Sequence, residues 1–222
     1  MPLKKQAKRR RKLDVSGILL SAGESKRMGQ PKALLKFGER SNIENLLDEY
    51  LSSQLDKVIV VTGFNGESLK KFIEKKTKNN LRSSLVGSKE VKKLKVVINE
   101  HYNLGMFSSI QKGIAEISRG GILIGIVDNP FTNSTVINEL IENFSGGEIV
   151  IPDYHGKGGH PVIIPFSLRE EILNANSEKT SLKDVFSCHL DMIKRIKFED
   201  QTITFDMDTV EDYNRLLSLW KK

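Results

Sequence analysis

The sequence predicts one α/β domain, a three-layer fold in which a mostly parallel sheet lies between two layers of helices. Three observations support this prediction. The 222 residues are enough to bury one full core. Short apolar runs typical of buried strands alternate with segments of helical periodicity over residues 1–150. The sequence contains no internal repeat and no proline-rich linker. Alternation of this kind favours parallel strands joined by helices that cover both faces of the sheet.

The elements of this first part follow from their apolar patterns. Between residues 42 and 54, apolar side chains such as Ile43, Leu46 and Leu47 recur every three or four positions, which marks one face of a helix. Residues 57–62 form a continuous β-branched run, as expected of a strand that is buried on both faces. In chain order we expect strand 17–20, helix 42–54, strand 57–62, helix 67–78, a polar loop 79–90, strand 95–98, helix 108–118, strand 121–127, helix 135–143 and strand 148–151.

Near Asp153 this regular alternation stops. A glycine-rich polar segment, residues 153–160, is followed by a short strand within 161–165 and by two helical stretches between 167 and 190. Strand-like pieces at 192–198 and 202–205 precede a last amphipathic helix over 210–220. We expect this part to form a lid or an elaboration of the same sheet, so that residues 14–222 make a single domain.

The formal charge of +7 comes from the beginning of the chain. Removing the seven cations found there from the 35 basic residues leaves 28, which equals the number of acidic residues. A run of like charge without apolar residues cannot pack, so residues 1–13 are expected to form a disordered basic tail. This tail is either solvated without a specific role or attached weakly to RNA, DNA or an anionic membrane surface. The seven cations are Lys4, Lys5, Lys8, Arg9, Arg10, Arg11 and Lys12.

Composition argues against several other classes of protein. No apolar run approaches the length that spans a bilayer, and no apolar segment follows the cations as it would in a signal peptide. A single cysteine, Cys188, excludes an internal disulfide and a multi-cysteine metal site, which fits a reducing cytoplasm. Because Cys188 lies in a mostly apolar segment, we expect a packed small side chain and not a nucleophile.

The loop after the first strand is the most informative segment of the chain. It contains Gly23 and Gly29 together with the cations Arg27 and Lys32. Glycine lets backbone N–H groups approach phosphate oxygens, and the cations neutralise the remaining charge. The spacing fits neither the P-loop nor the dinucleotide fingerprint. The residues alone therefore predict a strand-to-loop anion site, with an ordinary basic surface loop as the alternative.

Carboxylates follow other predicted strands. Asp128 ends an apolar run, and Asp206 and Asp208 end the strand-like piece near residue 205. Since the carboxyl ends of parallel strands meet at one edge of a sheet, these acids are expected beside the phosphate loop, where they would suit Mg²⁺. Each acid could instead cap a turn or a helix.

A general base is missing from this predicted site. The four histidines have no metal-ligand spacing, and no pair of nucleophile and base is evident. A phosphomonoester that attacks another phosphate is already an anion and needs no base. Catalysis would then rest on alignment and on charge neutralisation by metal and cations.

Several segments match an ordered set of motifs. Residues 20–35 (LSAGESKRMGQPKALL) are similar to L-A-A-G-x-S-x-R-M-G-x-P-K-x-L-L, and residues 60–63 (VVTG) and 99–114 to the segments that follow it. VDNP at 127–130 takes the place of a metal-binding Asp-x-Pro, GGHPVII at 158–164 resembles a Gly-His-Pro segment, and 205–213 a closing D-x-D-T-x-E-D. The chain thereby resembles the MobA-like nucleotidyltransferases, which have the GT-A type of Rossmann-like fold. The motifs span roughly residues 17–215, and an ordered set is more specific than any single motif.

This resemblance implies roles for individual residues. Arg27 and Lys32 would bind the triphosphate, and with Asp128 they would form the catalytic set. Asp128 and Asp208 would hold Mg²⁺, and Gly159 and His160 would face the acceptor. The implied nucleotide-binding residues are Leu20, Ser21, Ala22, Gly23, Arg27, Lys32, Thr62, Asn99, Gly105, Met106 and Ser109.

Within the family, the chain is most similar to the molybdenum cofactor cytidylyltransferases. Ala22 and Pro31 follow the cytidylyl pattern, whereas the guanylyl branch has glycine and aspartate there. The expected reaction is CMP transfer from CTP to molybdopterin with release of pyrophosphate. Ser21 departs from the family pattern, and so do Val127 and Asn129, the two neighbours of Asp128. Alternatives are a guanylyltransferase or a sugar- or alcohol-phosphate nucleotidyltransferase of the same fold, and a non-catalytic nucleotide-binding or RNA-associated protein.

Overall fold

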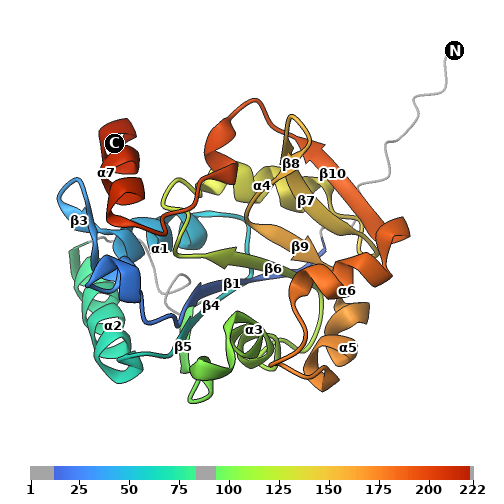
Figure 1. Ribbon diagram of the computed structural model, residues 1–222, viewed down its shortest axis with the longest axis horizontal. Coiled ribbons are helices and arrows are strands. Elements are labelled where there is room, and N and C mark those ends of the chain that lie inside the picture. The colour runs from blue at the N-terminus through green and yellow to red at the C-terminus, as the bar shows by residue number, and fades with distance from the viewer. Residues whose placement is uncertain (1–12, 84–93, 221–222) are drawn as a thin grey trace, which may run out of the picture.

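A mixed, mostly parallel sheet forms the centre of the molecule (Figure 1). The computed structural model describes residues 13–83 and 94–220. The sheet has eight strands in the order β10-β7-β9-β6-β1-β4-β5, with β8 paired to β7. β9 runs antiparallel to β6 and β7, and β8 antiparallel to β7, while the other pairs are parallel. These strands are β1 (Val15–Ser21), β4 (Lys57–Thr62), β5 (Leu94–Ile98), β6 (Gly121–Ile126), β7 (Ile149–Tyr154), β8 (Lys157–Gly158), β9 (Val162–Ile164) and β10 (Ile193–Lys197).

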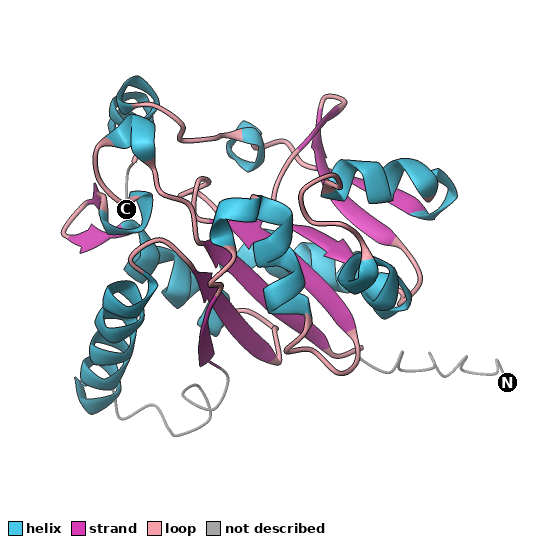
Figure 2. Ribbon diagram, turned by 60° about the horizontal axis from the view of Figure 1, so that its bottom comes forward, coloured by secondary structure: helices cyan, strands magenta, loops and turns pink. Residues whose placement is uncertain are grey.

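Helices cover both faces of this sheet (Figure 2). Apolar side chains of α1, α2 and α4 pack in the core on one face, and those of α3, α5 and α6 pack in the core on the other. The predicted three-layer α/β/α fold is thereby confirmed. The helices are α1 (Asn42–Ser52), α2 (Gly66–Ser83), α3 (Met106–Ile114), α4 (Ser134–Asn143), α5 (Arg169–Asn174), α6 (Leu182–Cys188) and α7 (Val210–Leu219).

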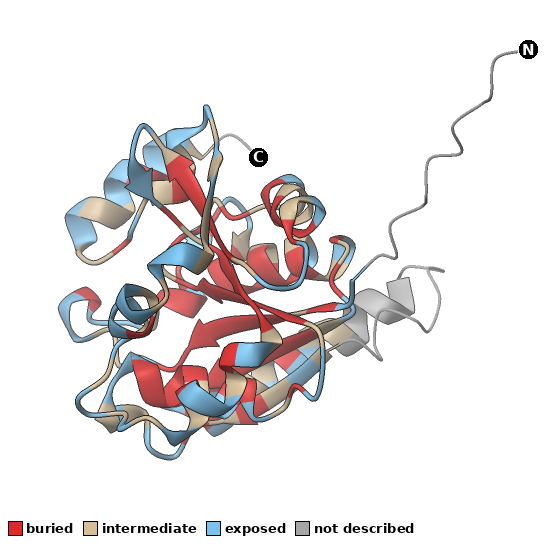
Figure 3. Ribbon diagram, turned by 90° about the vertical axis from the view of Figure 1, so that its right-hand side faces the viewer, coloured by how far each residue is buried: buried red, intermediate tan, exposed pale blue. Residues whose placement is uncertain are grey.

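The continuous apolar runs of the sequence are explained by burial from both sides (Figure 3). In β1, Leu19 packs into one core, whereas Ile18 and Leu20 pack into the other. A strand covered on both faces has no reason to alternate apolar with polar residues. The polar residues of the middle strands are therefore found at the strand ends, where they can serve a site.

Some predicted boundaries are wrong. The helix predicted over 67–78 is α2, which continues to Ser83, so residues 79–83 of the expected loop are helical. The remainder of that loop, residues 84–90, lies outside the described residues. α3 begins at Met106 and ends at Ile114, earlier than predicted. β7 extends three residues past its predicted end, into the segment expected to be a glycine-rich loop.

The strand predicted at 202–205 is also wrong, because this segment forms a 3-10 turn, Gln201–Thr204. The carbonyl groups of this turn accept hydrogen bonds from other segments. Asn129 Nδ2 donates to Thr202 O and Ile203 O, at 3.0 and 3.2 Å. The backbone N–H of His160 also donates to Ile203 O. With these carbonyls occupied, the alternating pattern of the sequence does not produce a strand.

A small hairpin not predicted from the sequence lies beside the C-terminal helix (Figure 1). It consists of β2 (Lys36–Phe37) and β3 (Arg40–Ser41). Phe37 contacts Tyr213 and Trp220, with ring centroids 5.5 and 5.0 Å apart. These contacts fix α7, and with it the segment that carries Asp208, against the loop after β1.

Two other expectations concern the ends of the domain and its cysteine. The predicted basic tail lies outside the described residues except for Leu13, and the single domain over 14–222 stays a prediction. Among the described residues, no helix has the length and apolar character required to cross a membrane. Cys188 was expected to be packed but is exposed, because α6 buries Val185 and the cysteine lies at the end of the helix.

Candidate active site

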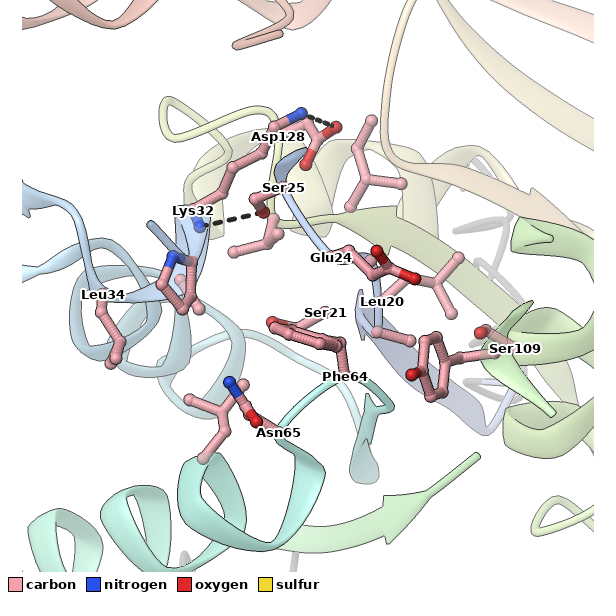
Figure 4. A pocket seen from close by; sticks show the side chains of 18 of the residues that line it. Leu20, Ser21, Glu24, Ser25, Lys32, Leu34, Phe64, Asn65, Ser109 and Asp128 are labelled. Atoms are coloured by element: carbon pink, nitrogen blue, oxygen red, sulfur yellow. Dashed lines mark hydrogen bonds and ion pairs between the residues drawn. The ribbon is translucent and has the colours of Figure 1, made fainter. Parts of the chain in front are cut away.

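A cavity of about 810 Å³ lies at the carboxyl ends of the central strands (Figure 4). Its wall consists of the end of β1 with the loop that follows, the residues around the start of α2, the N-terminal part of α3 and the residues after β6. Asp208 joins the wall from the C-terminal part of the chain. This position is the usual ligand site of open α/β sheets.

A cluster of charged side chains lies in the cavity wall. Lys32 Nζ lies 2.6 Å from Asp128 Oδ2 and 2.9 Å from Asp208 Oδ1. Arg27 Nη2 lies 3.4 Å from Asp208 Oδ2. Figure 4 shows the first of these ion pairs at one side of the pocket, with Ser109 on the other side. The fold thus brings together residues that are 96 and 176 positions apart in the chain.

The two carboxylates of this cluster differ in their surroundings. Burial raises the pKa of the Asp128 carboxyl, although Lys32 acts in the opposite direction. The hydrogen bond from Lys32 lowers the pKa of the Asp208 carboxyl. The directions differ because the Asp128 side chain is 25% exposed and that of Asp208 47%. Asp128 is therefore a partly buried acid whose charge is stabilised by a nearby cation.

Local backbone geometry places Lys32 in the cavity. Ser25 and Gly29 adopt left-handed conformations, with φ of 54° and 66°, which bend the loop after β1 back on itself. Ser25 Oγ then accepts a hydrogen bond from the backbone N–H of Lys32 at 3.2 Å. The Lys32 side chain is only 10% exposed, so its charge is held inside the site.

The two acids are not helix caps, which was the alternative interpretation of their positions. The N-cap of α4 is Asn133, whose side chain accepts from Val136 N. The N-cap of α7 is Thr209, which forms a capping box with Asp212. Asp128 and Asp208 are thus left to contact Lys32.

Most of the predicted nucleotide-binding residues line the cavity, but two do not. The side chain of Thr62 donates to Val97 O inside the sheet, and Asn99 Nδ2 donates to the hydroxyls of Ser108 and Ser109. Both residues are buried. They therefore support the wall and the start of α3 without facing the cavity. The predicted residues in the wall are Leu20, Ser21, Ala22, Gly23, Arg27, Lys32, Gly105, Met106 and Ser109.

The two predicted acceptor residues lie outside the cavity wall. Gly159 is buried against the turn at 201–204, where an added Cβ would lie 2.3 Å from Ile203 O. Burial lowers the pKa of the His160 imidazole, and its Nδ1 finds no hydrogen-bond partner among the described residues. In the described structure both residues pack the end of the sheet.

Some residues of the cavity wall are missing from the predicted set of binding residues, among them Phe64, Asn65 and Tyr102. Gly63 lets Tyr102 and the backbone of Ala22 lie close to the turn after β4, since a Cβ at Gly63 would lie 2.6 Å from Tyr102 Cβ and 2.7 Å from Ala22 O. Phe64 N donates to that same carbonyl at 3.0 Å. Their position directly after β4 and β5 was the signal, because residues that follow central strands face the ligand edge.

The donor set fits a divalent metal. Oxygens of two carboxylates converge on the single ammonium of Lys32, so an ion near that place would meet both. Mg²⁺ is commonly held by one or two carboxylates, with water and substrate phosphates completing its shell. In residues 13–83 and 94–220, no three His, Cys, Asp or Glu side chains form a ready-made metal centre. A metal would therefore bind together with the phosphates.

Cations and paired carboxylates at the strand ends of an α/β sheet are the groups that nucleotidyl transfer with a divalent ion requires. The model of the MobA-like NTP transferase domain matches residues 17–193, and the chain belongs to this family. The resemblance predicted from the motifs is confirmed.

Named relatives cover nearly the whole chain. Nicotine blue oxidoreductase of Paenarthrobacter nicotinovorans is 26% identical over 212 residues, which are 91% of this chain and 96% of that protein. A probable molybdenum cofactor guanylyltransferase of Methanosarcina mazei is 24% identical over an aligned length of 227 positions, gaps included, and the match covers 98% of this chain and 96% of that protein. The crystal structure of Rv0371c from Mycobacterium tuberculosis in complex with manganese has the same fold, with a TM-score of 0.66 and 20% identity over 92% of this chain and 98% of that one.

Proposed function

We propose that this nucleotidyltransferase moves CMP from CTP onto a phosphomonoester, with molybdopterin as the acceptor. An oxygen of the acceptor phosphate forms a bond to the α-phosphorus of CTP, and the bond from that phosphorus to the bridging oxygen breaks. Pyrophosphate leaves with the electron pair. The observation that supports this reaction best is the cluster of Lys32, Asp128 and Asp208 in the cavity wall.

The chain's own residues have distinct parts in this reaction. Lys32 and Arg27 neutralise the triphosphate and hold it in line for attack. Asp128 and Asp208 provide oxygen ligands for a divalent ion, which we propose to be Mg²⁺. Bound there, such an ion would offset the repulsion between the two phosphates. The manganese complex of the mycobacterial neighbour supports a divalent ion in this fold. No general base is required, because the attacking phosphate is already ionised.

The choice of base rests on two residues. Ala22 and Pro31, both in the cavity wall, carry the cytidylyl pattern. GTP is the alternative, favoured by the guanylyltransferase relative from Methanosarcina mazei. The relative named nicotine blue oxidoreductase favours a different class of reaction, an oxidation or a reduction. The cation and carboxylate cluster favours phosphate chemistry over that second candidate.

One assay separates these candidates. Purified protein is incubated with each NTP, Mg²⁺ or Mn²⁺, and either molybdopterin or a sugar phosphate, and pyrophosphate is measured. A parallel reaction follows oxidation of NADH or NADPH in the presence of a conjugated dye. Pyrophosphate release with CTP and molybdopterin is expected. Release with GTP alone would replace CTP, release with a sugar phosphate alone would replace the acceptor, and dye reduction without pyrophosphate would refute the proposal.

A variant tests the role of the buried acid. Asp128→Asn keeps the shape of the side chain and should lower turnover by about 10³-fold, since it removes charge from the centre of the site. The matched control is Asp191→Asn, an exposed acid in the 3-10 turn before β10. The control should retain the wild-type rate. Near-normal turnover of the Asp128 variant would refute a catalytic role for this residue.

A further inference from the structure

Asn42 is a fully buried polar residue next to the site, and no motif identified in the sequence includes its side chain. It is the first residue of α1, with 0% of its surface exposed. Its Nδ2 group donates to Val127 O at 2.8 Å and to Lys32 O at 3.3 Å. These two carbonyls lie 85 and 10 positions away in the chain, on the two segments that carry the cation and the acid of the site.

The amide oxygen of Asn42 makes the position unusual. It has no hydrogen-bond partner among the described residues. A buried unpaired acceptor lowers stability, so an apolar side chain of similar size would suit the acceptor side of this position better. The Nδ2 group explains why an amide stands here. Two backbone carbonyls face the same point, and one N–H₂ group can donate a hydrogen bond to each of them.

The two bonds connect the backbones from which the reacting groups extend. Val127 directly precedes Asp128, and the other acceptor is the carbonyl of Lys32 itself. The side chains of Lys32 and Asp128 then meet at 2.6 Å. Asn42 thus adds a side-chain connection to the bond between Lys32 N and Ser25 Oγ and to the ion pairs that hold Lys32 in place.

We propose that Asn42 is a positioning residue that sets the separation of Lys32 and Asp128 and so determines the rate of nucleotidyl transfer. The proposal rests on the function proposed above. Asn42 touches neither substrate nor metal, and it acts through the two segments that it joins. Because catalytic groups must be held within about 0.5 Å of their working geometry, loss of this connection reduces turnover more than substrate affinity.

The test is Asn42→Leu, which keeps the volume and removes both donors. We expect kcat to fall about 10- to 100-fold, as for a misplacement of roughly 1 Å, while KM for the NTP changes less than threefold. The control is Asn45→Leu on the same helix, whose Nδ2 donates to Phe37 O in the β2–β3 hairpin at 3.1 Å. The control should keep both constants within threefold of wild type.

A double variant separates positioning from a general structural effect. In a Lys32→Met background, Asn42→Leu should cost less than threefold in kcat, because the separation it maintains no longer matters. An equal loss in both backgrounds, or an unchanged kcat in the single variant, overturns the proposal. If the leucine variant does not fold, Asn42→Ser keeps one donor and should have a kcat below that of wild type. A serine variant with wild-type kcat also overturns it.

A structural measurement keeps this test independent of the proposed reaction. Crystal structures of wild type and Asn42→Leu should show the Lys32 to Asp128 contact at 2.6 Å in the first and a displaced Lys32 segment in the second. An unchanged contact in the variant overturns the positioning role even when no substrate has been identified. Absence of wild-type turnover with every NTP and acceptor would instead refute the proposed function.

Discussion

Replacing Lys32 by methionine should have opposite effects on turnover and on metal binding. Methionine keeps the apolar stem and removes the ammonium that lies 2.6 Å from Asp128 and 2.9 Å from Asp208. In the free protein this ammonium occupies the two carboxylates that would hold a divalent ion in the proposed function. Its removal lowers turnover, because the triphosphate loses a cation, and lets a divalent ion bind the carboxylates without competition.

The size of each effect follows from the exposure of the three groups. Hydrogen bonds to charged groups contribute about 1.5–3 kcal/mol each, and the bond to the 47% exposed Asp208 must be discounted for solvent. We therefore expect the free energy of unfolding to fall by about 2 kcal/mol in the absence of metal. Mn²⁺ at about 100 times its Kd should return about 2.7 kcal/mol. Turnover should fall about 10²- to 10³-fold.

The assay combines thermal unfolding with and without MnCl₂ and steady-state kinetics at saturating substrates. Lys36→Met is the matched control, since Lys36 is exposed, lies four residues after Lys32, and its Nζ donates to Glu39 O outside the site. The control should behave as wild type in both measurements. The reasoning is refuted if Mn²⁺ raises the Tm of wild type and Lys32→Met equally, or if the variant keeps its turnover within threefold.

Two further predictions concern stability. Burial raises the pKa of Glu44, but bonds from Ser41 and Lys76 lower it from 4.5 to about 2. Folding thus favours the charged form, and about 3 kcal/mol of stability, present above pH 4.5, is lost as the pH falls toward 2. Glu44→Gln should remove this pH dependence in urea unfolding between pH 7 and pH 2.5, and an unchanged profile would contradict it. Tyr50→Phe should stabilise the protein by about 1 kcal/mol, because its hydroxyl is buried against Gly125 without a hydrogen-bond partner among the described residues. A lower Tm for this variant would show that the hydroxyl has a partner.

The sheet was predictable because its strands are buried on both faces. Residues 58–61 of β4 and the whole of Gly121–Ile126 are apolar, so the positions of these strands did not depend on alternation. The helices were predictable from spacing, as in α1 and α4, whose apolar residues pack into one core. Helix ends were less accurate, because the residues that end a helix also depend on tertiary contacts.

The irregular parts could not be predicted, since contacts between residues far apart in the chain decide them. The segment at 201–204 has an alternating pattern, but Asn129 and the backbone of His160 bond to its carbonyls. The β2–β3 hairpin depends on Phe37 packing against α7, which is more than 170 positions away in the chain.

The site, too, could be predicted in one respect and not in another. The strand-end rule correctly indicated which segments meet, so Lys32 and Asp128 were expected together and lie in contact. The rule says nothing about the direction of a side chain. Asn99 follows β5 as expected but turns inward to bond Ser108 and Ser109. Asn42 could not be identified from the sequence, because its partners are two backbone carbonyls, and every residue of every sequence has a carbonyl.

The charge balance of the cluster explains how one site holds both a partly buried acid and a buried cation in the free protein. Lys32 and Arg27 carry two positive charges, and Asp128 and Asp208 carry two negative ones; Lys32 contacts both acids, and Arg27 contacts Asp208. A metal–triphosphate brings its own cation for the acids and its own anion for the cations. Binding would therefore exchange ion pairs and would leave no buried charge uncompensated, which avoids the desolvation penalty of an isolated charge. Lys32→Met removes one member of this exchange, and for that reason its effects on metal binding and on turnover must have opposite signs.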